Sequence, residues 1–169
     1  MNAQTLNLFI IDDNLLMLVG LRSYLNNRFG SDLNISTFHS GESALQKIDV
    51  NTNIVILDYL LEDENGNEVL KSIKKINPNT EVIMLSSNED MAVAIRAFRN
   101  GAKDYVIKGE KSWKKLTSII YNILVYPIRL MVREFGINKY IAIFLLTFIT
   151  IGIGVSIALK VIPHYVFNS

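Results

Sequence analysis

No cysteine occurs among the 169 residues of the chain. This absence excludes a disulfide framework, zinc sites built from thiolates and catalysis by a thiol, and it fits a reducing compartment. No secretory signal peptide is predicted either, because Met1–Thr5 is neutral and the first apolar stretch is short and ends in Asp12 and Asp13.

Acidic residues are nearly absent from the last third of the chain. Lys111–Ser169 contains seven Lys and Arg residues but one acidic residue, Glu134, whereas Met1–Glu110 has a net charge of −5. A basic part that is interleaved with long apolar runs suits an anionic lipid surface better than nucleic acid. The acidic first part suits a magnesium site.

The segment Tyr140–Leu159 has no charged residue in 20 positions. A run of this length can cross the hydrocarbon core of a bilayer. The alternative, a buried core helix, is disfavoured because little chain remains to cover a helix that is apolar on every side. The basic residues Lys114, Lys115, Arg129, Arg133 and Lys139 precede the run, whereas Lys160 follows it. The positive-inside rule therefore predicts a single-pass protein whose N-terminal domain lies in the cytoplasm.

Upstream of this run, predicted strands and helices alternate. The apolar run Ile54–Leu57 is typical of a strand buried on both faces of a parallel sheet. Five strands are predicted, at Leu6–Ile11, Leu33–Phe38, Asn53–Leu57, Glu81–Leu85 and Lys103–Ile107. A helix is predicted after each, from the cap Asn14 to Arg28, from Ser40 to Ile48, from Gly66 to Ile76, from a cap at Ser87 or Asn88 to Arg99, and from Ser112 to Tyr126, where Pro127 breaks or kinks it. Five such repeats predict an α/β fold with a doubly wound parallel sheet.

Polar side chains follow four of the predicted strands. In a sheet ordered 2-1-3-4-5, the ends of these strands lie at one edge and bring together Asp12, Asp13, Asp58, Ser86 and Lys108. Three carboxylates repel one another, and a hard cation such as Mg²⁺ relieves the repulsion. A carboxylate with a cation, an ammonium and a hydroxyl around it suits phosphoryl transfer, in which Asp can be the nucleophile. Taken singly, the same residues are typical of a helix cap, a turn serine and a solvated lysine.

Four short motifs occur in order, and together they resemble one family. They are Ile11-Asp12-Asp13-Asn14, then Leu57-Asp58 with Gly66 eight residues later, then Met84-Leu85-Ser86, and finally Lys103–Gly109. In this arrangement, residues Met1 to about Tyr126 resemble the receiver domain of bacterial two-component response regulators, of the chemotaxis-regulator type. Such domains are phosphoacceptors rather than enzymes.

The resemblance implies a role for each site residue. Asp58 would accept a phosphoryl group from a histidine kinase or a phosphotransfer protein, and Ser86 and Lys108 would bind that group. Tyr105 stands at the position of the family's switch aromatic. Mg²⁺ would be held by the carboxylates of Asp12, Asp13 and Asp58 and by the backbone carbonyl of Leu60. One departure concerns the loop after Asp58, where Glu62 replaces the usual proline and begins the acidic run Glu62-Asp63-Glu64.

The expected organisation is a receiver domain at 1–126, an amphipathic juxtamembrane linker at 127–139, a transmembrane helix at 140–159 and a short tail at 160–169. After the receiver, the sequence leaves no room for a DNA-binding output domain. We therefore expect a receiver anchored in the bacterial inner (cytoplasmic) membrane that signals through protein contacts. Two alternatives stay open, a phosphate sink or phosphorelay intermediate, and a non-phosphorylated scaffold. Small residues at Thr150, Gly154 and Ala158 favour pairing of two spans into a homodimer.

Overall fold

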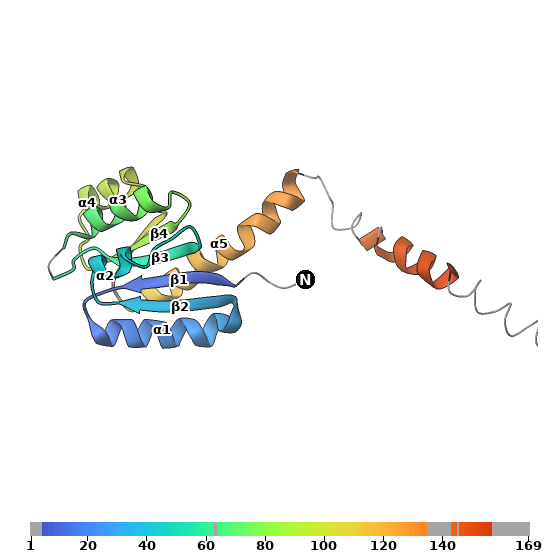
Figure 1. Ribbon diagram of the computed structural model, residues 1–169, viewed down its shortest axis with the longest axis horizontal. Helices are drawn as coiled ribbons and strands as arrows, with labels where there is room; N and C mark the ends of the chain where they lie inside the picture. The colour runs from blue at the N-terminus through green and yellow to red at the C-terminus, as the bar shows by residue number, and fades with distance from the viewer. Residues whose placement is uncertain (1–4, 63, 135–142, 145, 157–169) are drawn as a thin grey trace, which may run out of the picture. The chain divides into compact units, whose positions relative to one another are not determined.

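A five-stranded parallel sheet forms the centre of the computed structural model, which describes residues 5–62, 64–134, 143–144 and 146–156 (Figure 1). The strands are β1 (Leu6–Ile11), β2 (Leu33–Phe38), β3 (Thr52–Asp58), β4 (Glu81–Ser86) and β5 (Asp104–Ile107). Their order is β2-β1-β3-β4-β5, as predicted. All neighbouring pairs are parallel, and the register sets Ile11 beside Leu57, Asp58 beside Leu85 and Ser86 beside Ile107. The carboxyl ends of β1, β3, β4 and β5 therefore meet at one edge of the sheet.

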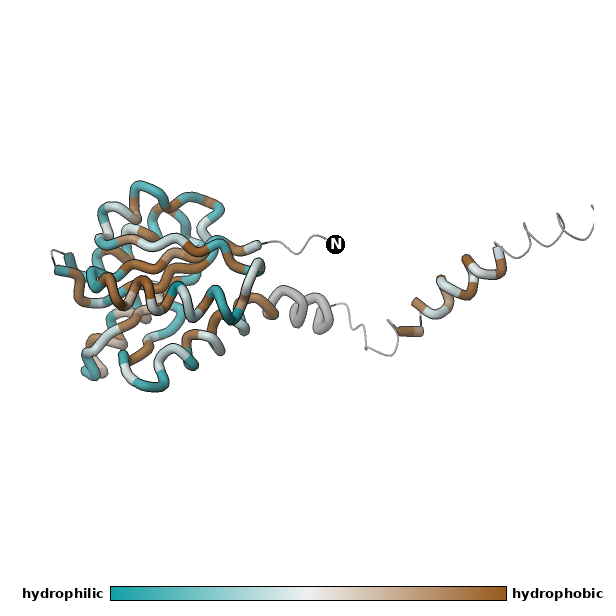
Figure 2. The backbone as a smooth tube through the Cα atoms, turned by 90° about the horizontal axis from the view of Figure 1, so that it is seen from below, coloured by the Kyte–Doolittle hydropathy of each residue, from teal (hydrophilic) through white to brown (hydrophobic). Residues whose placement is uncertain are grey.

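Helices cover both faces of the sheet. They are α1 (Leu15–Phe29), α2 (Gly41–Leu45), α3 (Gly66–Ile76), α4 (Met91–Arg99) and α5 (Ser112–Glu134), with a 3-10 turn at Gly30–Asp32. The first part of α5 packs beside α1, since the rings of Tyr24 and Trp113 lie 5.2 Å apart and Gly20 faces the same indole. Helices α2, α3 and α4 lie on the opposite face (Figure 1). The central strands are the most hydrophobic stretches of the domain (Figure 2), and Ile54, Val55, Ile56 and Leu57 are at most 1% exposed.

Several helix ends differ from the predicted ones. The cap Asn14 is confirmed, because its side chain accepts a hydrogen bond from Met17 N at 3.1 Å. Helix α4 is capped by Asp90, and not by Ser87 or Asn88, because the Asn88 side chain is already used in the preceding turn, where it accepts from Asp90 N. Helix α2 ends at Leu45 instead of Ile48, although Ile48 stays buried beneath the turn that follows.

Helix α5 also runs further than predicted. It continues to Glu134, so Pro127, which has no backbone N–H, lies inside a helix. The chain divides into two units, Met1–Ile120 and Tyr121–Ser169, and the boundary falls within this helix. The unit Met1–Ile120 contains the whole sheet.

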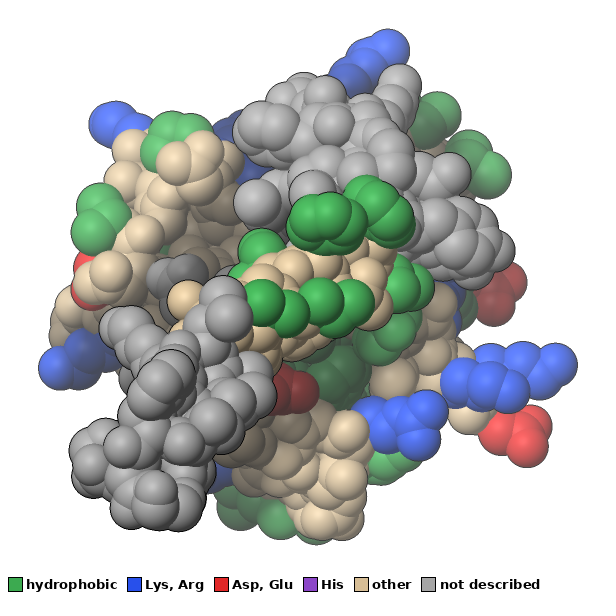
Figure 3. Space-filling model, turned by 90° about the vertical axis from the view of Figure 1, so that its right-hand side faces the viewer, with side chains coloured by type: hydrophobic (Ala, Val, Ile, Leu, Met, Phe, Trp, Pro, Cys, Tyr) green, Lys and Arg blue, Asp and Glu red, His purple; other side chains and the backbone are tan. Residues whose placement is uncertain are grey.

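The predicted span Tyr140–Leu159 lies partly outside the described residues. Within it, residues 143–144 and 146–156 are helical, and their side chains are exposed. Figure 3 shows hydrophobic side chains on the described turns of this helix. In the part of the chain that the structure describes, no helix is both long enough and apolar enough to cross a membrane. The segments 135–142 and 157–169, which hold part of the expected linker and all of the expected tail, are outside the described residues.

Candidate phosphoryl acceptor site

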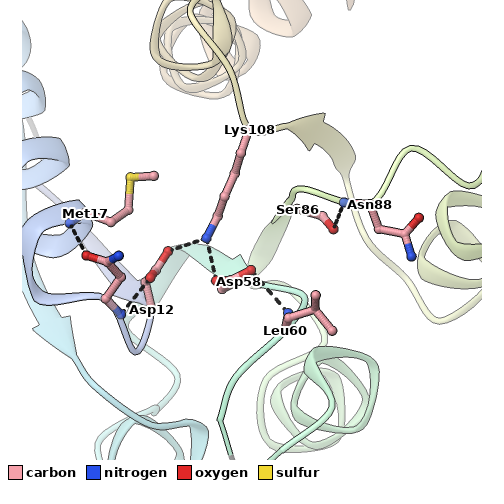
Figure 4. A network of polar contacts seen from close by, with 8 residues as sticks. Asp12, Met17, Asp58, Leu60, Ser86, Asn88 and Lys108 are labelled. Carbon is pink, nitrogen blue, oxygen red and sulfur yellow. Dashed lines mark hydrogen bonds and ion pairs between the residues drawn. The ribbon is translucent and has the colours of Figure 1, made fainter.

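Two buried carboxylates and one ammonium meet at the carboxyl edge of the sheet (Figure 4). Asp12 follows β1 and is 1% exposed, and Asp58 ends β3 and is 4% exposed. The Nζ of Lys108, directly after β5, lies 2.9 Å from Asp12 Oδ2 and 2.5 Å from Asp58 Oδ2. Because the ammonium contacts both carboxylates, it offsets the cost of burying two negative charges.

A third carboxylate completes an acidic cluster. One oxygen from each of Asp12, Asp13 and Asp58 lies within 4.8 Å of the other two, and Asp13 is exposed while its partners are buried. Carboxylate oxygens are the ligands that Mg²⁺ prefers, and an exposed side leaves room for the water ligands that this ion retains. The residues present therefore fit a magnesium ion.

Burial sets the electrostatics of Asp58. It raises the pKa of this carboxyl above its ordinary value, the nearby charge of Asp12 adds to the rise, and the hydrogen bond from Lys108 opposes it. Burial alone would lower the pKa of Lys108, but hydrogen bonds to Asp58 and Asp12 outweigh it and raise that pKa. The site thus holds an ammonium between two buried carboxylates, and burial raises the pKa of the Asp58 carboxyl.

The loop after Asp58 folds back tightly onto the end of β3. Asp58 Oδ1 accepts a hydrogen bond from Leu60 N at 3.2 Å, and Tyr59 O accepts one from Gly66 N at 2.9 Å. A Cβ atom at Gly66 would lie 2.4 Å from Asp58 O, so the backbone itself occupies the space of a side chain. The Leu60 side chain points outward and is 57% exposed.

Ser86 and Tyr105 lie next to this group and are linked through Asn88. The Ser86 hydroxyl is fully buried and accepts from Asn88 N at 3.0 Å, while Tyr105 Oη donates to Asn88 O at 2.9 Å. Burial raises the pKa of the Tyr105 phenol. Among the described contacts, the Ser86 hydroxyl bonds to Asn88 and not to the Asp58–Lys108 pair.

The structure thus brings together four of the predicted residues directly, Asp12, Asp13, Asp58 and Lys108, and it places Leu60 against Asp58 through the backbone. Sequence patterns did not identify the linking role of Asn88, although its position two residues after a strand-end serine is typical of a side-chain turn. They also gave no partner for Glu64, whose carboxylate accepts a hydrogen bond from Glu42 N at 3.0 Å. That contact joins residues 22 positions apart, and nothing in the local sequence indicates it.

Comparison with known proteins gives consistent matches. The "Response regulator protein VraR" of Staphylococcus saprophyticus is 28% identical over 104 residues, which are 61% of this chain and 49% of VraR. The chain therefore matches about half the length of that relative. The structure titled "BeF3 Activated DrrB Receiver Domain" shows a TM-score of 0.64 at 27% identity and covers 72% of this chain and 98% of its own.

A chain from the "CheX-CheY-BeF3-Mg+2 complex from Borrelia burgdorferi" shows a TM-score of 0.63 at 25% identity, covering 71% of this chain and 90% of its own. Residues 8–120 match the family described as "Response regulator receiver domain". This match spans about two-thirds of the chain and contains Asp12, Asp13, Asp58, Ser86, Tyr105 and Lys108. The chain therefore belongs to the response regulator receiver domain family.

Proposed function

We propose that this chain accepts a phosphoryl group on Asp58 from the phosphohistidine of a histidine kinase or a phosphotransfer protein. The observation that carries the proposal is the contact of Lys108 with both Asp12 and Asp58, beside the three-carboxylate cluster. A nucleophilic carboxylate, a fixed cation and an oxygen-lined metal position are the parts that phosphoryl transfer requires.

In the proposed reaction, an Asp58 carboxylate oxygen attacks the phosphorus of the donor. An O–P bond forms, the P–N bond breaks, and its electron pair leaves with the imidazole nitrogen. Lys108 holds a positive charge beside the incoming phosphoryl oxygens, and the Ser86 hydroxyl moves from Asn88 to a phosphoryl oxygen. Mg²⁺, held by Asp12, Asp13, Asp58 and the Leu60 carbonyl, would neutralise charge on the phosphoryl group. The titles of similar structures name BeF3 and Mg²⁺, which supports the binding of a phosphoryl group and of Mg²⁺ at this site.

We propose further that the phosphorylated form signals through protein contacts and not through DNA. Apolar side chains on the surface of α4 support this, since Met91, Ile95 and Phe98 are 71%, 46% and 49% exposed. Exposed apolar side chains grouped on one helix are typical of an interaction surface. Tyr105, on the strand that follows α4, would report the state of Ser86 to this surface through Asn88.

Attachment to the bacterial inner membrane, with the receiver in the cytoplasm, is also part of the proposal. Its support comes from the sequence, in which Tyr140–Leu159 lacks charge and basic residues precede it. A receiver held at a membrane would meet membrane-bound kinases and partners at a higher local concentration.

The acceptor is tested with the full chain and acetyl phosphate or beryllofluoride, with and without EDTA. We expect Mg²⁺-dependent modification of the wild type and of Asp49→Asn, a control that changes an exposed aspartate outside the site. We expect no modification of the Asp58→Asn variant. Modification of Asp58→Asn at the wild-type level refutes the assignment.

A further inference from the structure

The loop after Asp58 is tied to helix α2 by one carboxylate. Glu64 Oε1 accepts a hydrogen bond from Glu42 N, at the start of α2, over 3.0 Å. The N–H groups of a first helical turn lack partners within their own helix. Ser40 satisfies a second such group, because its Oγ accepts from Ser43 N at 3.2 Å. Helix α2 has only five residues, so these two contacts satisfy much of its first turn.

The Glu64 carboxylate packs closely against the backbone of α2. A Cβ atom at Gly41 would lie 2.6 Å from Glu64 Oε2 and 2.5 Å from Val69 Cγ2, and Gly41 is buried. The carboxylate therefore rests against the bare backbone of α2. Any outward movement of α2, or any larger side chain at position 41, would displace it.

The other end of the same loop reaches the acceptor site. Leu60 pairs with Asn65 in an isolated antiparallel bridge, and Leu60 N donates to Asp58 Oδ1 at 3.2 Å. Glu64 N donates to Leu61 O at 3.4 Å. A displacement of Glu64 is thus transmitted through Asn65 and Leu61 to Leu60, whose carbonyl is a proposed ligand of Mg²⁺.

We infer that Glu64 is a positioning residue that holds the Leu60 carbonyl in place for Mg²⁺ by anchoring the acceptor loop to α2. The inference rests on the proposed function, since it concerns the same metal position. Groups that orient a metal ligand without contacting the metal contribute about 10- to 100-fold to metal affinity. Asn65 and Gly66 hold this loop against the end of β3, and Glu64 ties it to α2.

The test measures Mg²⁺ affinity of the purified full chain by titration calorimetry, with thermal unfolding in EDTA recorded in parallel. Glu64→Leu removes the hydrogen bond and the charge, whereas Glu64→Gln keeps an oxygen acceptor. Glu62→Leu is the matched control, because Glu62 is an exposed carboxylate in the same loop and its loss changes the net charge equally.

We expect Glu64→Leu to bind Mg²⁺ about tenfold more weakly than Glu62→Leu, and Glu64→Gln to stay within about twofold of the wild type. Equal affinities of the two leucine variants, or an equal loss in Glu64→Gln, would overturn the inference. Glu64→Ala replaces Glu64→Leu if the latter does not fold, and the same comparison then applies. A wild type that binds no Mg²⁺ would instead count against the proposed function itself.

Discussion

Tyr105 Oη donates a hydrogen bond to the backbone carbonyl of Asn88 at 2.9 Å, and the ring is only 7% exposed. The same Asn88 donates its N–H to Ser86 Oγ. Tyr105 and Ser86 therefore contact the same residue, and the Ser86 side chain also interacts with the Tyr105 phenol.

The first prediction concerns Tyr105→Phe, which removes this hydrogen bond and leaves the ring in place. We expect a loss of about 1 kcal/mol in the free energy of unfolding, the usual contribution of one hydrogen bond. Urea unfolding of the full chain measures it. Tyr121→Phe is the control, because Tyr121 is 55% exposed, and it should leave the stability unchanged. Equal stabilities of Tyr105→Phe and the wild type would show that the contact with Asn88 contributes nothing.

The second prediction follows from the raised pKa of Asp58. The folded chain binds a proton at this carboxyl more readily than the unfolded chain does, so this group's contribution to stability falls as pH rises from the ordinary pKa of 3.8 through the folded pKa. In EDTA near neutral pH, Asp58→Asn should therefore be more stable than the wild type, because Lys108 keeps its contact with Asp12. Thermal unfolding between pH 3.5 and pH 7 measures the difference, which we expect to shrink toward acid. A difference that grows toward acid would contradict it.

The third prediction is that Mg²⁺ stabilises the folded chain through the carboxylate cluster. At about 100 times its dissociation constant, a ligand that binds only the folded state adds about 2.7 kcal/mol. We expect this gain in the wild type and its loss in Asp13→Asn, whose exposed side chain belongs to the cluster. Unfolding with Mg²⁺ or EDTA measures it, and Asp32→Asn serves as a control remote from the cluster. An equal gain in Asp13→Asn would exclude Asp13 as a ligand.

The fourth prediction is a long-lived aspartyl phosphate. Leu60 and Asn88 stand two residues beyond Asp58 and Ser86. The resemblance to receiver domains implies that side chains at these two positions flank the water that attacks the phosphoryl group. The apolar Leu60 side chain cannot orient a water molecule. We expect Leu60→Asn to lose phosphate faster than the wild type, as measured by release of labelled phosphate after the donor is removed. Unchanged or slower release in the variant would contradict it.

The fifth prediction concerns the uncharged segment near the C-terminus. An uncharged span avoids the penalty of about 2.5–3.5 kcal/mol that each central charge imposes on insertion. Alkaline carbonate should leave the full chain in the membrane pellet, and its release into the supernatant would refute insertion.

If the chain also pairs through Thr150, Gly154 and Ala158, Gly154→Ile should lower the yield of crosslinked dimer, and an unaltered yield would exclude this pairing surface.

The sheet and its order can be predicted from the sequence because apolar runs such as Ile54–Leu57 have few compatible structures. The same logic predicts the meeting of Asp12, Asp58 and Lys108, since parallel strands share one carboxyl edge. Local patterns are less decisive at helix ends. Ser87, Asn88 and Asp90 are all good caps, and only the turn that uses Asn88 leaves the role to Asp90. Similarly, Ile76 fits the apolar spacing of α3 but is 45% exposed, because it is the last residue of that helix.

Contacts between distant segments could not be predicted. The hydrogen bond from Glu42 N to Glu64 depends on how α2 and the acceptor loop pack, and an acidic run carries no information about a partner. The link from Tyr105 through Asn88 to Ser86 depends on the same kind of packing. At Pro127 a local pattern gives the wrong helix end, because a residue that normally ends helices lies within α5.

Gly66 makes one position of the chain intolerant of substitution. Its missing side chain would collide with the carbonyl oxygen of Asp58 and with the Cα atom and carbonyl oxygen of Tyr59, none of which can rotate away as a side chain does. A saturation library over residues 59–66 should therefore return glycine alone at position 66, whether clones are selected for folding or for phosphorylation. At position 60, where the side chain faces solvent, the two selections should enrich different residues. This contrast would separate what the loop needs for folding from what it needs for phosphorylation.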